Sequence, residues 1–154
     1  MCARQYLNVK DLLNEKENTL LPLHDYKSNH IMMTKVTIIH NPRCSTSRNI
    51  LQMVEENGIE TDTILYLQGK LKTRNLQSIL KKLKLGPLEI IRKKEPLFVE
   101  QFQDKTLTDD EWIQVIVENP VLLERPILIK GQRAIIGRPV EAVEKFLKIK
   151  KQKV

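Results

Sequence analysis

One cysteine, Cys44, stands in a short polar segment that directly follows the apolar run Val36–Ile39. Residues 40–49 read His-Asn-Pro-Arg-Cys-Ser-Thr-Ser-Arg-Asn, which predicts a junction between a strand and a helix. The first amides of a helix and nearby guanidinium groups favour negative charge, so a thiol placed there loses its proton readily. The same amides can hold a small tetrahedral oxyanion. We therefore expect a nucleophilic thiolate that faces an anionic substrate.

Three neighbours could support the thiolate of Cys44: His40, Ser47 and Arg48. His40 can lower the thiol pKa as an imidazolium or orient the loop, and a strand-end histidine satisfied by backbone groups is an equal alternative. Ser47 stands where a Cys-x-x-Cys motif would have its second cysteine, so its hydroxyl is left to hydrogen-bond the thiolate. Any disulfide chemistry at Cys44 then needs an outside thiol. The alternative of a cysteine that acts as a small buried hydrophobe fits poorly with its polar neighbours.

Composition argues against several other kinds of protein. With 154 residues, of which 41% are hydrophobic and 29% charged, the chain suits one soluble domain. No apolar run approaches the roughly 20 residues that span a bilayer, and the first residues show no secretory pattern, so we expect a cytoplasmic protein without a membrane partner. Two cysteines, Cys2 and Cys44, are too few for a disulfide scaffold or a zinc site, and we expect no metal.

The formal net charge of +7 arises outside residues 1–32, where acidic and basic side chains balance. Part of the excess lies in the lysine-rich segment at residues 145–154. Basic tails can bind nucleic acid, but this one lacks the interleaved aromatic residues that single-strand binders use. We therefore expect a solvated end and no nucleic-acid partner.

Hydrophobic periodicity from residue 35 onward predicts alternating strands and helices. Expected strands are Val36–Ile39, Thr63–Leu67, Ile127–Lys130 and Arg133–Gly137, the last two joined by a tight hairpin at Gly131-Gln132. The first expected helix is Ser45–Asn57, and the second is capped by Thr73 and ended by Gly86-Pro87. Two short helices, broken by Pro96, are expected at Leu88–Lys93 and Leu97–Phe102. The capping box Thr108-Asp109-Asp110-Glu111 begins a further helix, and Pro139 begins the last one, whose inward residues are Val140, Val143, Phe146 and Leu147. This order predicts an α/β, thioredoxin-like three-layer fold with a mixed sheet and a helical insert between strands 2 and 3.

The chain is expected to divide into three parts. Residues 1–32 lack sustained periodicity and are interpreted as a disordered extension outside the core. Residues 33–147 are expected to form the folded domain, and residues 148–154 a basic tail. Limited proteolysis is expected to trim the chain early to about Met33.

The cysteine segment resembles the active-site loop of the glutaredoxin-linked arsenate reductases, in the pattern His40-Asn41-Pro42-x-Cys44-x-Thr46-Ser47-Arg48-Asn49. The resemblance covers residues 35–147 and includes further motifs in the same order. These are Leu65-Tyr66-Leu67, Ile91-Arg92-Lys93, Thr108-Asp109-Asp110, Asn119-Pro120, Glu124-Arg125-Pro126-Ile127 and Ile136-Gly137-Arg138-Pro139. Arg43 and Ser45 depart from the best-known members, which have smaller residues there, and the version Asn-Pro-Arg-Cys-Ser is similar to a shorter subgroup of the family.

The resemblance implies that Arg92, Arg125 and Arg138 surround the cysteine and bind the substrate. Arsenate carries about two negative charges near neutral pH, and planar guanidinium groups bind such oxyanions bidentately. For each arginine taken singly, a surface ion pair is the alternative. The resemblance also implies that Pro126 is a cis-proline that faces Cys44, although a cis bond is the less common form of any X-Pro peptide.

As a member of this family, the chain would reduce arsenate to arsenite without a bound cofactor. Cys44 would attack arsenate, glutathione would attack the resulting adduct as co-substrate, and glutaredoxin would help to release arsenite and restore the thiol. Two alternatives stay open. Spx-type regulators resemble the same fold and contact RNA polymerase, although many use a second cysteine where Ser47 stands. A different glutathione-linked thiol oxidoreductase would use the same nucleophile on another substrate.

Overall fold

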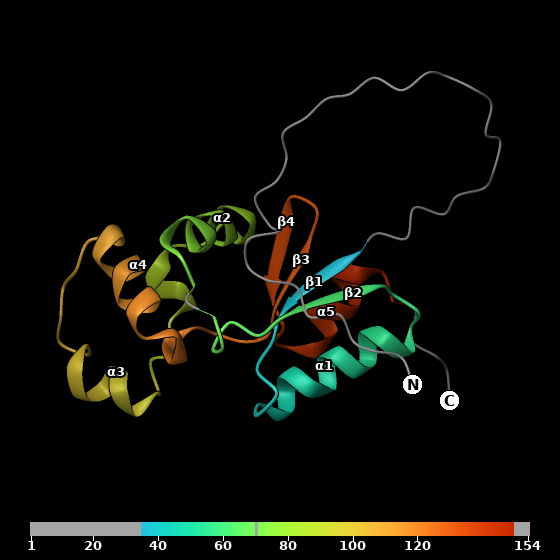
Figure 1. The fold of residues 1–154 in the computed structure, drawn as a ribbon, viewed down its shortest axis with the longest axis horizontal. Coiled ribbons are helices and arrows are strands. Elements are labelled where there is room, and N and C mark those ends of the chain that lie inside the picture. Colours follow the sequence, from blue (N-terminus) through green and yellow to red (C-terminus); the bar gives the residue numbers. More distant parts are fainter. Residues whose placement is uncertain (1–34, 70, 150–154) are drawn as a thin grey trace, which may run out of the picture.

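The computed structural model describes residues 35–69 and 71–149, which form a four-stranded mixed sheet with helices on both faces (Figure 1). The strands are β1 (Val36–Ile39), β2 (Thr61–Ile64), β3 (Ile127–Lys130) and β4 (Arg133–Ile136), in the spatial order β2-β1-β3-β4. β1 pairs with β2 in parallel, whereas the β1–β3 and β3–β4 pairs are antiparallel. The α/β class, the mixed sheet and the three layers expected from the sequence are confirmed.

Side-chain alternation along the strands divides the core between the two faces of the sheet. One face packs against α1 (Ser45–Glu56) and α5 (Val140–Leu147), and it includes the cross-strand pair Ile38 and Leu128. The other face presents Ile39 and Ile127 to the helical insert. Figure 1 shows α1 and α5 on one side of the strands and the insert on the other.

The insert lies between β2 and β3, as expected from the sequence. Its elements are α2 (Thr73–Leu83), the 3-10 turn η2 (Pro87–Ile90), α3 (Pro96–Gln101), α4 (Asp109–Glu118) and the 3-10 turn η3 (Pro120–Leu122). Trp112 of α4 stacks near Phe98 of α3, with ring centroids 6.0 Å apart, and both side chains are buried. An antiparallel bridge between Ile91 and Leu123 joins the segments after η2 and η3, so the residues on either side of this bridge are brought together.

The second strand differs from the prediction Thr63–Leu67, since β2 begins at Thr61 and ends at Ile64. The parallel register pairs Val36 with Thr61 and Ile39 with Ile64, so backbone pairing extends the strand towards its start although those residues are not apolar. The N–H of Gln68 then donates to the carbonyl of Leu65 at 3.0 Å and turns the chain. Tyr66 therefore lies in a turn, and its side chain is fully buried.

Several helix boundaries also differ from the prediction. Lys72, not Thr73, is the N-cap of α2. Pro96 does not break a helix but is the first residue of α3, where its missing N–H costs no hydrogen bond. The helix predicted at Leu88–Lys93 is the shorter turn η2, because Ile91 is extended and bridges Leu123 instead.

The capping box of α4 is confirmed: the Thr108 N–H donates to Glu111 Oε2 at 2.7 Å, and the Glu111 N–H donates to Thr108 Oγ1 at 3.4 Å. In α5, Pro139 is the N-cap and Val140 is exposed, which corrects the inward placement of Val140. Val140 lies in the first turn, ahead of the buried stripe of Val143 and Leu147 that packs on the sheet.

The expected extension at residues 1–32 lies outside the described residues, and so does the basic tail beyond residue 149. The division into extension, domain and tail therefore stays a prediction. Within residues 35–69 and 71–149, no helix is long and apolar enough to cross a membrane.

Candidate active site

Cys44 lies at the N-cap of α1, at the end of a loop that the chain folds locally. The loop leaves β1 at His40, whose N–H still donates to the Ile64 carbonyl of β2 at 2.9 Å. Asn41 then closes the turn: its side-chain oxygen accepts the Arg43 N–H at 2.9 Å, and its carbonyl accepts the Cys44 N–H at 3.0 Å. Such an asparagine turn is a common way to redirect a chain into a helix. It leaves the Cys44 thiol half-buried at the positive end of α1.

The side chain of Ser47 holds this loop in place through two contacts with its first residues. Its side chain is fully buried, its Oγ lies 2.9 Å from Nδ1 of the buried His40 ring, and it accepts the Asn41 N–H at 3.2 Å. The predicted hydrogen bond from the Ser47 hydroxyl to the thiolate is therefore replaced by contacts within the loop. Among the roles predicted for His40, this geometry favours orientation of the loop by the imidazole ring.

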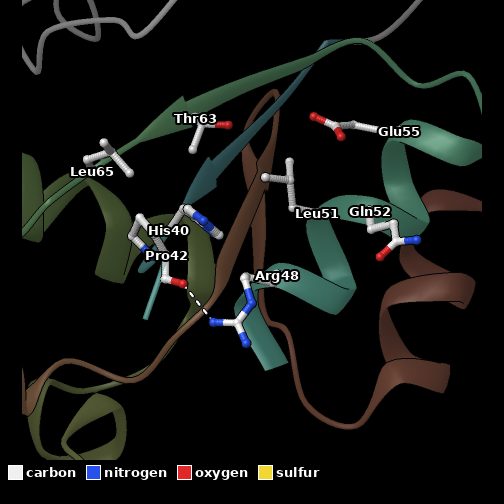
Figure 2. Close-up of a pocket in the computed structure, with 8 residues that line it drawn as sticks. All are labelled: His40, Pro42, Arg48, Leu51, Gln52, Glu55, Thr63 and Leu65. Carbon is white, nitrogen blue, oxygen red and sulfur yellow. Dashed lines mark hydrogen bonds between the residues drawn. The ribbon is translucent and has the colours of Figure 1, made fainter. Parts of the chain in front are cut away.

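Arg48 also braces the loop rather than the sulfur. Its side chain is exposed, and its Nη1 donates to the Pro42 carbonyl at 2.8 Å (Figure 2). Figure 2 shows both residues at a hollow that Leu51 and Thr63 also line. The volume of this hollow is about 340 Å³. Cys44 is not among the residues that line this hollow, so the hollow is not the site of the reactive thiol.

The electrostatics around Cys44 favour the thiolate. Burial of the Cys44 thiol raises its pKa. The Ser47 backbone N–H and the guanidinium groups of Arg125 and Arg138 together outweigh that effect, so the pKa is lowered below its ordinary value. The nucleophile expected from the sequence thus has the charge environment that it needs.

The structure brings Arg125 and Arg138 close to Cys44 and joins Arg92 to the same cluster. Burial lowers the pKa of Arg92, and so do the charges of Arg125 and Arg138, which places the three guanidinium groups within electrostatic reach of one another. Arg138 Nη2 donates to Thr46 Oγ1 at 3.4 Å and so reaches the first turn of α1. These residues come from segments far apart in sequence, yet they meet at the end of the sheet where the cysteine loop begins.

The ion-pair alternative holds for one of the three arginines. Arg92 forms an ion pair with Glu95, three residues later in the chain. Neither Arg125 nor Arg138 forms an ion pair within residues 35–69 and 71–149, and Arg125 Nη1 donates instead to the Val121 carbonyl at 3.0 Å. Two guanidinium groups therefore keep donors for an anion.

Pro126 joins the segments of Arg125 and Arg138. The Arg125–Pro126 peptide is cis, as the resemblance implies, and the Arg138–Pro139 peptide is cis as well. The Gly137 N–H donates to the Pro126 carbonyl at 2.7 Å, and a Cβ at position 137 would lie 2.6 Å from Pro126 Cγ. Gly137 is therefore needed for this close backbone approach, which holds the two arginines at a fixed separation.

Tyr66 lies in the motif Leu65-Tyr66-Leu67 of the family resemblance, but the sequence assigned it no role in the site. Its hydroxyl is buried and has no hydrogen-bond partner among the described residues, although the Arg125, Arg92 and Cys44 side chains all act on its pKa. The available signal was its place just after β2, because the segments that follow parallel strands meet at one edge of a sheet. Glu124 was also missed: its charge acts on Arg92, and one of its carboxylate oxygens is buried without a partner among the described residues.

No group of three or more histidine, cysteine, aspartate or glutamate side chains is placed to hold a metal ion in the described part of the chain. The chemistry available is that of a thiolate, fixed amides and guanidinium groups. Such a set can bind a tetrahedral oxyanion and attack its central atom.

The fold and the site define a thioredoxin-like α/β protein in which a cysteine of lowered pKa lies at a helix N-terminus, close to arginines that flank a cis-proline. Residues 39–146 match the ArsC family, and the chain belongs to that family.

The arsenate reductase of Haemophilus influenzae is 41% identical over 114 residues, which are 73% of this chain and 98% of that protein. The "Uncharacterized protein YfgD" of Escherichia coli K12 is 42% identical over 114 residues, 73% of this chain and 96% of that protein. The structure of the arsenate reductase from Vibrio cholerae superposes with a TM-score of 0.68 at 35% identity, and the match covers 76% of this chain and 98% of that one. The resemblance stated from the motifs is confirmed.

Proposed function

We propose that this protein reduces arsenate to arsenite, with Cys44 as the nucleophile. The observation that carries the proposal is the thiol of lowered pKa at the helix N-terminus beside Arg125 and Arg138. Relatives named arsenate reductase, which this chain matches along 98% of their length, support arsenate as the oxyanion. Arg92, Arg125 and Arg138 are proposed to neutralise its charge and to hold its oxygens for in-line attack.

The first step is a substitution at arsenic. The Cys44 thiolate forms a sulfur–arsenic bond, and one arsenic–oxygen bond breaks, so that oxygen leaves as water after it takes up a proton. Arsenic stays pentavalent in this adduct, and no electrons have yet been transferred. The guanidinium groups stabilise the oxygens that stay behind.

Reduction then needs a second thiol, because Cys44 is the only cysteine among the described residues and Ser47 replaces a resolving cysteine. We propose glutathione as this co-substrate: its sulfur bonds to Cys44, the sulfur–arsenic electron pair returns to arsenic, and arsenite leaves. Over the two steps arsenate and two thiols give arsenite, one disulfide and water. Glutaredoxin is proposed to reduce the mixed disulfide, in the cytoplasm where glutathione is kept reduced.

The direct test measures arsenite formed from arsenate with glutathione and glutaredoxin present. Wild-type protein is expected to turn over, and Cys44→Ser to show none, because an alcohol neither attacks arsenic nor forms the disulfide. Cys2→Ser is the matched control and is expected to keep full activity. A wild-type protein that forms no arsenite under these conditions contradicts the proposal.

The regulator alternative has less support in this chain. A disulfide switch would need a thiol at position 47, where the serine hydroxyl is buried against His40. Reduction of a different oxidised thiol substrate would use the same nucleophile, and the assay separates it from arsenate reduction because only the latter releases arsenite.

A further inference from the structure

Two buried hydrogen-bond donors beside Cys44 have no acceptor among the described residues: the Tyr66 hydroxyl and Arg125 Nε. Buried polar groups in proteins are nearly always hydrogen-bonded, and an unpaired one costs free energy. Both atoms belong to side chains and take no part in the backbone hydrogen bonds of the sheet and helices. Secondary structure therefore does not explain why these two donors are buried. Two such donors at one place fit an acceptor that belongs to a ligand.

The position of Tyr66 follows from the sheet. β2 ends at Ile64 beside Ile39, and Tyr66 lies in the turn that follows, where its side chain is within electrostatic reach of Arg125, Arg92 and Cys44. The Tyr66 ring packs in the apolar cluster of the insert and is fully buried, so the hydroxyl has little freedom to move away. Burial raises the pKa of Tyr66, although Arg125 and Arg92 oppose this effect, so the hydroxyl keeps its proton at neutral pH and acts as a donor.

We propose that the Tyr66 hydroxyl, together with Arg125 Nε, donates a hydrogen bond to an oxygen of the tetrahedral oxyanion bound at Cys44. This inference rests on the proposed function and adds a neutral donor to its cationic site. The arginines supply charge, whereas the short and rigidly packed phenol supplies direction. A hydrogen bond from this hydroxyl would favour an oxyanion that has an oxygen at one fixed position relative to the Cys44 sulfur.

The test compares wild type with Tyr66→Phe. Iodoacetamide alkylates Cys44, and bound arsenate should slow that alkylation, so the arsenate concentration that gives half-protection measures affinity. Loss of one hydrogen bond to a charged group is expected to weaken half-protection about 10- to 100-fold. The alkylation rate without arsenate should stay the same, because Tyr66 is neutral.

Thermal unfolding separates a ligand contact from a structural one. The variant removes only a hydroxyl that has no hydrogen-bond partner among the described residues, so its melting temperature should be equal to or above that of wild type. Phe98→Leu is the matched control, since it disturbs the same apolar cluster without removing a polar atom and should leave half-protection unchanged.

The outcomes distinguish this inference from the proposed function. If arsenate does not protect wild-type Cys44, the proposed function itself fails. If arsenate protects wild type and Tyr66→Phe equally well, the inference is wrong and the proposed function stands. A lowered melting temperature in Tyr66→Phe would assign the hydroxyl a structural role and would also overturn it.

A second feature, a hollow of about 480 Å³ beside the arginine cluster, carries a separate inference. Arg92 and Arg138 belong to both the hollow and the site, so the two are continuous. The complete lining is Leu88, Glu89, Ile91, Arg92, Lys93, Lys94, Glu124 and Arg138. It contains more cations than carboxylates, and it therefore suits a small molecule that is anionic overall but also carries an ammonium group.

We infer that this hollow receives the thiol co-substrate, a small peptide thiol with carboxylates such as glutathione. The inference rests on the proposed function, because that function requires an outside thiol to reach the sulfur of Cys44. Lys93 and Lys94 are exposed at this hollow and are free of any role assigned above. They are placed to bind the carboxylates while Arg92 and Arg138 stay on the oxyanion.

The test is the double variant Lys93→Glu/Lys94→Glu in the arsenite assay. The KM for glutathione is expected to rise about 3- to 10-fold, whereas the KM for arsenate should change less and turnover with the uncharged thiol 2-mercaptoethanol should not change. Lys81→Glu/Lys145→Glu makes the same charge change on α2 and α5, outside this hollow, and should leave both KM values unchanged. Equal rises for glutathione and arsenate, or no rise for glutathione, would overturn the inference. Absence of turnover in wild type would instead count against the proposed function.

Discussion

The loop that carries Cys44 is braced by hydrogen bonds within residues 40–48, whereas the oxyanion side collects Arg92, Arg125 and Arg138 from distant segments. The side-chain hydrogen bonds made by Asn41, Ser47 and Arg48 all have their partners within this loop. On the oxyanion side, Arg125 Nε has no partner among the described residues. The loop is thus held by protein groups, whereas the arginine cluster keeps a buried donor that no described residue satisfies. The difference teaches that the shape of the cysteine loop is set locally, whereas the lowered pKa of Cys44 and the oxyanion side both depend on arginines that the whole fold brings in.

Arg125→Leu should break the oxyanion side most severely. Under the proposed function, removing this guanidinium takes away a donor to the oxyanion and is expected to lower kcat/KM for arsenate about 100- to 1000-fold. Because the Arg125 charge helps to lower the pKa of Cys44, its loss should also move the midpoint of the alkylation profile to higher pH. Arg125→Lys should restore the pH midpoint more than it restores kcat/KM, since it returns the charge without the planar fork.

Arg133→Leu provides the matched control for that experiment. Arg133 lies over the Phe146 ring at 5.3 Å, away from the cluster, and its loss should leave both kcat/KM and the pH midpoint unchanged. An equal effect of the two substitutions would mean that Arg125 has no special role in the site.

Gly137→Ala should separate the two arginine-bearing segments. A Cβ there would overlap Pro126, so the segments must move apart, and the free energy of unfolding is expected to fall by about 1–3 kcal/mol. Urea unfolding measures this loss, and kcat/KM should fall with it because Arg125 and Arg138 lose their fixed separation. Gly86→Ala, where a Cβ meets only the flexible end of Glu89 at 3.3 Å, should cost little in either measurement.

Ser47→Ala tests the thiol side. The substitution leaves His40 Nδ1 and the Asn41 N–H without their common partner, so the free energy of unfolding should fall by about 1–2 kcal/mol. The pH midpoint of Cys44 alkylation should hardly move, because the backbone N–H of residue 47 is still present. The exposed Ser45→Ala is the control, and a large shift of the midpoint in Ser47→Ala would mean that the hydroxyl itself contacts the sulfur.

Arg48→Ala should have the smallest effect. Its exposed hydrogen bond to the Pro42 carbonyl is worth about 0.5 kcal/mol or less in unfolding free energy, and this hydrogen bond engages its guanidinium with the loop backbone. We expect the midpoint of alkylation to stay in place. A clear upward shift would return Arg48 to the thiolate-supporting role expected from the sequence.

The sequence predicted the thiol side and the order of elements well, because those signals are local. A polar cysteine segment after a buried strand defines a helix N-terminus, and the Thr108 capping box is visible in the residue order itself. The arginine cluster could not be worked out from pattern alone, since Arg92 and Arg138 meet only through the sheet and the Ile91–Leu123 bridge. It came from a family resemblance.

Other features required the three-dimensional structure. Pairing with β1 places the second strand at Thr61–Ile64, so Tyr66 lies in the turn that follows it. Hydrophobic periodicity does not indicate this shift of the strand. Likewise, nothing in the residue types showed that the Ser47 hydroxyl points to His40 while its backbone N–H serves the sulfur. Tertiary pairing and side-chain direction determine these details.

The cluster of Arg92, Arg125 and Arg138, of which only Arg92 has an ion-pair partner among the described residues, has a consequence for turnover under the proposed function. Arsenate arrives as an anion, but arsenite near neutral pH is an uncharged acid. The reaction therefore removes the charge that the site recognises, and the product loses its electrostatic hold at the moment it forms. Release of arsenite would need no opening of the fold, and the emptied cationic site would draw in the next anion.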